Sequence, residues 1–121
     1  MTYESTARYE SAVLPGVSFQ VVRMSFGRRL ALVRELRAIT TKSEYHRAGG
    51  GGDDAVEAAL LEAEADRICL RWGLAGVAGL EIDGTPATAD ALFAAGPEEF
   101  CREVVQRIRQ ECFLTDEQQK N

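Results

Sequence analysis

The chain has 121 residues, of which 45% are hydrophobic and 27% charged, as in one ordinary globular domain. Its net charge of −5 argues against binding to duplex nucleic acid, which requires a basic surface. It contains no apolar run of about 18 residues that could cross a membrane, and its first residues lack the pattern of a signal peptide, so we expect a cytoplasmic protein.

Residues 1–24 are expected to form a β-hairpin. The segments RYESAVL and VSFQVVRM are rich in β-branched and aromatic residues with rough alternation. Pro15-Gly16 between them suits a turn, because proline presets φ and glycine accepts a positive φ.

A first helix is predicted over residues 25–47, with Ser25 as its N-cap. Its apolar residues recur every three or four positions, as expected of one buried stripe. They are Phe26, Leu30, Val33, Leu36 and Ile39. The opposite surface is basic and carries Arg28, Arg29, Arg34, Arg37 and Lys42.

Residues 48–53 are predicted to be a flexible glycine linker, because four consecutive glycines cost too much backbone entropy to continue a helix. A phosphate-binding loop is excluded, since two aspartates follow the last glycine in place of lysine and Ser/Thr.

A second helix is expected over 54–73, capped by Asp53 or Asp54. Its predicted apolar stripe is Val56, Ala59, Leu60, Ala63 and Leu70, widened by Ile68, Cys69 and Trp72. Its polar surface is largely acidic.

The segment 74–87 is expected to be a short β segment with a hairpin turn at Asp83-Gly84. Two helices should follow within 88–113, the first capped by Thr88 and the second started by Pro97. The apolar face of the second helix is Cys101, Val104, Val105, Ile108 and Cys112. Residues 114–121 are expected to be a frayed tail, or to be held by a neighbouring molecule. The whole chain is thus predicted to be one mainly helical α+β domain of about four helices.

The sequence offers no arrangement that predicts catalysis, metal binding or a cofactor, so we expect a protein that is not an enzyme. The three cysteines lack zinc-site spacing and are expected to be small buried side chains. Glu62 and Asp66 could converge on one helix face, but no histidine accompanies them, so a solvated face is expected. His46 stands alone beside the glycines and is expected to be a surface residue or a helix cap.

Charge is distributed unevenly along the chain. Residues 1–48 hold eight Lys or Arg and four Asp or Glu, whereas residues 49–121 hold six and fifteen. The basic helix could pair with the acidic one, or it could dock an acidic or amphipathic partner. Single-stranded nucleic acid is disfavoured, because no aromatic residues alternate with the arginines. The candidate partner-binding residues are Arg28, Arg29, Arg34, Arg37 and Trp72, although Trp72 is expected first of all in the core, with a binding role as its second interpretation.

Four segments resemble the tail assembly chaperones of tailed phages and prophages. They are MSFGRRLALVRELR (24–37), RWGLAGVAGLEIDGTPAT (71–88), GPEEFCREVVQRI (96–108) and LTDEQQKN (114–121). The resemblance implies a non-enzymatic protein that binds the long helical tape measure protein before the tail tube polymerises around it. The resemblance also leaves open whether this chain has a longer form made by frameshifting and whether it forms a homo-oligomer. Two alternatives remain: a head–tail connector component of the phage particle, and an acidic immunity-type inhibitor of a basic enzyme.

Overall fold

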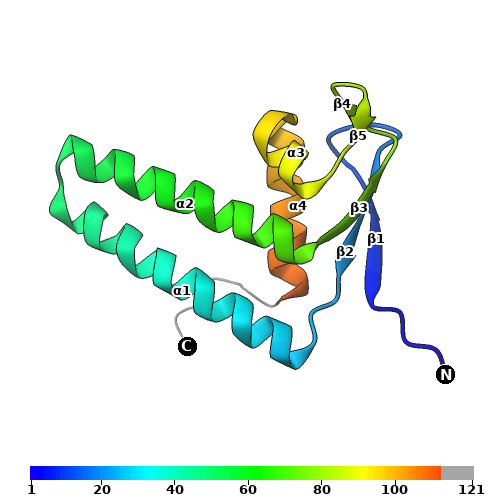
Figure 1. Ribbon diagram of the computed structural model, residues 1–121, viewed down its shortest axis with the longest axis horizontal. Coiled ribbons are helices and arrows are strands. Elements are labelled where there is room, and N and C mark those ends of the chain that lie inside the picture. Colours follow the sequence, from blue (N-terminus) through cyan, green and yellow to red (C-terminus); the bar gives the residue numbers. More distant parts are fainter. Residues whose placement is uncertain (113–121) are drawn as a thin grey trace.

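In the computed structural model, which describes residues 1–112, a three-stranded antiparallel sheet adjoins four helices. Two of these helices extend away from the sheet as an arm (Figure 1). This arrangement confirms the predicted fold class, a mainly helical α+β fold with an N-terminal β-hairpin and short central β segments. The predicted tail at 114–121 lies outside the described residues.

The N-terminal hairpin forms as predicted, but its first strand lies earlier than expected. β1 (Thr6–Glu10) pairs with β2 (Ser18–Val22). The chain turns directly after β1, where the Ser11 hydroxyl accepts hydrogen bonds from the N–H groups of Val13 and Leu14. β3 (Leu74–Ala78) then pairs antiparallel with β2 and completes the sheet, an addition that the sequence did not predict.

The arm consists of α1 (Phe26–Gly49) and α2 (Gly52–Gly73). Ser25 caps α1 as predicted, accepting a hydrogen bond from the Arg28 N–H at 3.2 Å. The predicted linker over 48–53 is wrong, since only two residues separate the helices. Gly50 ends α1 in the left-handed conformation with a φ of 72°.

The start of α2 also differs from the prediction. Its N-cap is Gly51, which has no side chain to accept a capping hydrogen bond, and Asp53 and Asp54 lie in the first turn. Asp54 instead accepts a hydrogen bond from His46 of α1 across the turn, at 2.9 Å. The four glycines therefore end α1, form the two-residue connection and begin α2.

The C-terminal half follows the prediction closely. β4 (Glu81–Ile82) and β5 (Thr85–Pro86) flank Asp83 and Gly84, whose φ angles of 52° and 81° match a type I′ turn. Thr88 caps α3 (Ala89–Ala95), and Pro97 precedes α4 (Glu98–Glu111).

The hydrophobic core lies where α4 and the C-terminal end of α2 meet one face of the sheet. Phe19 of β2 and Phe100 of α4 are fully buried and pack edge-to-face with ring centroids 5.7 Å apart. Cys69 and Cys112 are buried as predicted, whereas Cys101 is half-buried. The Tyr9 hydroxyl donates a hydrogen bond to Glu111, which fastens β1 to the end of α4.

The predicted apolar stripes of the two arm helices are only partly correct, because Leu36, Cys69 and Leu70 are buried as predicted while other members are exposed. Phe26 and Leu30 are 84% and 47% exposed, and the buried residues of α1 are Leu32, Leu36 and Ser43. In α2 the predicted residues Val56, Ala59, Leu60 and Ala63 are all exposed. Besides the predicted Cys69 and Leu70, the buried residues of α2 are Ala58, Ala65 and Gly73.

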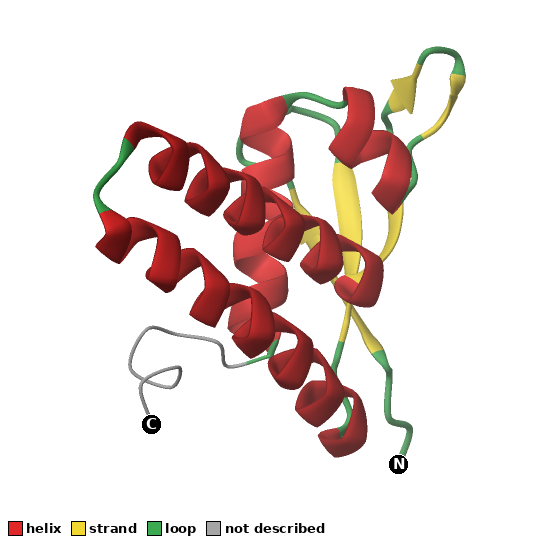
Figure 2. Cartoon of the chain, turned by 60° about the vertical axis from the view of Figure 1, so that its left-hand side comes forward, coloured by secondary structure: helices red, strands yellow, loops and turns green. Residues whose placement is uncertain are grey.

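The length of the helices explains the difference in α2. At 1.5 Å per residue, helices of 24 and 22 residues are about 33–36 Å long, more than the core can cover. Figure 2 shows that they lie side by side and that their connection is far from the strands. In this distal part each helix buries only small residues, Ser43 and Ala58, against the other. None of the helices in the described part of the chain has the length and apolarity required to span a bilayer.

Candidate functional site

Two of the predicted binding residues, Arg28 and Trp72, join the arm helices near the sheet. The Arg28 guanidinium donates to the Trp72 carbonyl oxygen at 2.9 Å and lies 5.2 Å from the centroid of the indole ring. The indole N–H donates to Glu35 of α1 at 3.1 Å. Because Trp72 also packs against the core, these contacts give both residues a structural role in holding α1 to α2.

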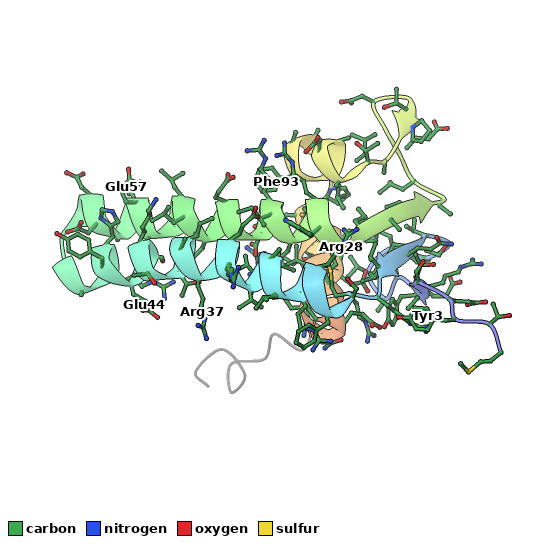
Figure 3. The ribbon with its side chains drawn as sticks, turned by 60° about the horizontal axis from the view of Figure 1, so that its bottom comes forward. Tyr3, Arg28, Arg37, Glu44, Glu57 and Phe93 are labelled. Carbon is green, nitrogen blue, oxygen red and sulfur yellow. The ribbon has the colours of Figure 1, made fainter. Side chains whose placement is uncertain are left out.

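The other three predicted residues lie apart from this pair. Arg29 is half-buried and lies near Cys112. Burial raises the pKa of the Cys112 thiol to about 11, and the charge of Arg29 opposes that rise. Arg34 and Arg37 are exposed, and Figure 3 shows Arg37 pointing away from α2. The five residues therefore do not form one continuous surface.

The expected pairing between basic α1 and acidic α2 is limited to the end of the arm far from the sheet. Arg47 forms an ion pair with Glu62, and His46 contacts Asp54. Within residues 1–112, no ion pair joins Arg34, Arg37 or Lys42 to α2. Charge pairing thus leaves most of the basic surface of α1 exposed to solvent.

The exposed apolar residues of α2 form a surface that faces away from α1. We call it the outer α2 surface, and it consists of Val56, Ala59, Leu60 and Ala63 together with Asp53, Glu57 and Glu64. Val56 and Leu60 are each 59% exposed and are one helical turn apart. Figure 3 places Glu57 and Phe93 of α3 on one side of the arm, and Arg37 and Glu44 on the other. Phe93 is 39% exposed, so it adds an aromatic side chain to the same side of the molecule.

This surface is suited to binding another helix. Its apolar residues have the spacing i, i+3, i+4 and i+7, which is the pattern that one helix presents to another. The α2 backbone beneath it is regular, and its hydrogen bonds are satisfied within the helix, so the binding face is already formed. The exposed Val56 and Leu60 on this regular helix can therefore pack against a complementary apolar stripe.

The ionisable groups offer no reactive site among the described residues. Burial raises the pKa of Cys69 to about 11 and also raises the pKa of Cys101, so both are thiols at neutral pH. No group of three or more His, Cys, Asp or Glu in residues 1–112 is placed to hold a metal ion.

One shallow hollow of about 270 Å³ lies on the sheet, lined in part by Arg8, Gln20 and Gly76. Arg8 is its only charged lining residue, and it contacts Glu10 at 3.2 Å outside the hollow. The hollow has no second ionisable group for acid–base chemistry, so we centre the candidate site on the outer α2 surface.

Sequence reasoning identified Val56, Ala59, Leu60 and Ala63 but assigned them to the core. The lengths of the two helices already indicated that part of this stripe would be exposed. A globular chain of this length has a radius of gyration of about 14 Å, so two helices of more than 20 residues cannot bury their whole length.

Comparisons with protein families, with characterised proteins and with solved structures found no match to this chain.

Proposed function

We propose that this protein is a non-enzymatic binding module whose arm receives a helical segment of another protein. The exposed stripe containing Val56 and Leu60 is the observation that carries this proposal. Isolated apolar residues are common on protein surfaces, but a stripe with helical periodicity on a projecting helix is typical of helix-in-groove or helix-on-helix recognition.

The resemblance to tail assembly chaperones supplies the class of partner. We propose that the bound segment belongs to a tape measure protein of a tailed phage, which is long and helical. A module of this kind needs an exposed helix-binding surface and no catalytic group. The buried thiols and the exposed stripe of this chain are compatible with that requirement.

Co-expression with the tape measure protein of the same phage tests the proposal. We expect a soluble complex that co-purifies with the wild-type chain, and its loss when Val56 and Leu60 are both replaced by serine. The matched control replaces Phe26 and Leu30 of α1 by serine, since these exposed residues lie on the other arm helix. Failure of the wild-type chain to co-purify would contradict the proposal.

The same phage can separate a chaperone from a head–tail connector. A chaperone should be absent from purified virions, whereas a connector should be present in a ring-like copy number. Quantitative mass spectrometry of virions makes this distinction, and finding the protein there would replace the chaperone proposal by the connector.

A further inference from the structure

We infer, on the basis of the proposed function, that the helix bound by the outer α2 surface is a basic amphipathic helix, with Lys or Arg beside its apolar stripe. The proposed function requires only a helical partner. The charge of that partner follows from how the carboxylates of α2 are arranged and neutralised.

All charged residues in the N-terminal two-thirds of α2 are acidic. Residues 52–66 contain six carboxylates and no Lys or Arg. Three of these carboxylates have partners from other helices. Asp54 contacts His46, Glu62 pairs with Arg47, and Asp66 pairs with Arg109 of α4 at 3.3 Å.

The carboxylates on the outer α2 surface are different. Asp53, Glu57 and Glu64 have the spacing i, i+4 and i+11, so they form a row along the helix beside Val56 and Leu60. Within residues 1–112, Asp53 and Glu57 have no ion-pair partner, and Glu64 contacts only Arg67, at 3.4 Å.

The helix dipole offsets little of this charge. Its positive end acts within the first turn, so it reaches Asp53 but not Glu57 or Glu64. A partner helix with basic residues along one side of its stripe would neutralise the row while covering the apolar residues. An acidic helix would meet the same row with like charges and would be disfavoured.

Two labelled peptides and the full-length protein test this inference by fluorescence anisotropy. Both peptides have about 20 residues, enough to form an isolated helix, and share one Leu/Ala stripe. One carries Lys beside the stripe and the other carries Glu. At low salt we expect the Lys peptide to bind about tenfold more tightly than the Glu peptide. In 1 M NaCl, where the Debye length is about 3 Å, this difference should nearly disappear.

Charge reversal on the two sides of the arm supplies a matched pair of variants. Glu57→Lys should weaken binding of the Lys peptide by about threefold to tenfold. Glu44→Lys makes the same change of charge on the opposite side of the arm and should leave binding nearly unchanged (Figure 3). Leu60→Ser should weaken both peptides, whereas Leu30→Ser on α1 should weaken neither.

The outcomes separate this inference from the proposed function. If both peptides bind equally through Leu60, the helix-binding surface stands and the basic partner is overturned. If neither peptide binds, or if Leu60→Ser has no effect, the surface itself is overturned. Sedimentation velocity adds one further outcome. Self-association that Leu60→Ser abolishes would assign the surface to a second copy of the chain and overturn the inference.

Discussion

Gly79 follows β3 in a backbone conformation that other residues rarely adopt. Its φ is +85°, and a Cβ at this position would collide with the carbonyl oxygen of Gly16 in the β1–β2 loop. Gly73 also lies close to another element, because a Cβ there would collide with Ile108 of α4. The glycines around Trp72 thus allow β3 and α4 to approach their neighbours closely.

Replacing Gly79 by alanine should destabilise the fold. We expect Gly79→Ala to lower the free energy of unfolding by about 2 kcal/mol or more, through backbone strain and the collision with Gly16. Gly76→Ala, three residues earlier in β3, is the matched control, since no heavy atom lies within 4 Å of its added Cβ. Urea denaturation of the two variants makes the comparison, and equal stability would show that the loop yields without cost.

The buried cysteines should resist alkylation in the native state. Burial raises the pKa values of Cys69 and Cys112 to about 11, so very little thiolate exists at pH 8. We expect iodoacetamide to modify the half-buried Cys101 first, and to modify Cys69 and Cys112 only after denaturant is added. Mass spectrometry of the alkylated peptides gives the order, and rapid labelling of Cys69 in the native protein would contradict the prediction.

The Tyr9 hydroxyl links stability to alkaline pH. Its hydrogen bond to Glu111 raises the pKa of Tyr9 above the usual 10, with burial as a smaller cause. The neutral phenol is therefore favoured in the folded state, and its stabilisation is complete below pH 10 and lost as the pH rises through the raised value. We expect wild-type protein to be more stable than Tyr9→Phe at pH 7, and the difference to shrink above pH 10 in denaturant titrations.

At the scale of elements, the arm helices show how a periodic pattern can be correct about structure and wrong about burial. Val56, Ala59, Leu60 and Ala63 predicted a helix, and α2 is a helix. They did not predict the buried side, because α2 also carries a second stripe of small residues that includes Ala58 and Ala65. Small residues allow close approach of α1, so this stripe forms the helix–helix contact.

The same substitution on each arm helix measures this difference. Leu60→Ala removes a side chain that is 59% exposed and should change the free energy of unfolding by no more than about 0.5 kcal/mol. Leu32→Ala removes a fully buried side chain and should cost about 2–5 kcal/mol. Thermal and urea denaturation test both, and a large cost at Leu60 would indicate that its side chain is covered in solution.

At the scale of the whole molecule, stability should be unevenly distributed. The core contacts of α4, β2 and the C-terminal end of α2 are concentrated near the sheet, while, among residues 1–112, the two helices of the distal arm pack only on each other. The proposed binding surface therefore lies on the part of the molecule with the fewest tertiary contacts, where a partner could add stabilising contacts.

Hydrogen exchange should detect this gradient. We expect amides in the region 42–62 to exchange through local opening at a lower free energy than amides of β2 and α4, which should exchange near the global limit. Mass spectrometry of native-state exchange at several urea concentrations can resolve the two classes. Equal protection in both regions would show that the arm and the core unfold as one unit.

The sequence by itself determined the type of nearly every element and many of their ends. Ser25 and Thr88 cap helices, Asp83-Gly84 forms the predicted tight turn, and α3 begins directly after its predicted cap. These features depend on interactions within a few residues, and such interactions can be inferred from neighbouring residues in the sequence. The sequence also indicated candidate binding residues. It could not show that they lie apart in the folded protein, because their positions depend on packing between distant segments.

Only the tertiary structure decided how far along each arm helix the buried side extends, that β3 joins the N-terminal hairpin, and that Trp72 is held by Arg28 and Glu35. Each of these features depends on contacts between residues far apart in the chain. The extent of the core determined how much of each arm helix is buried, because core contacts end partway along α1 and α2. Beyond that point the apolar stripe of α2 has no partner among the described residues, which is why residues expected in the core form the candidate binding surface.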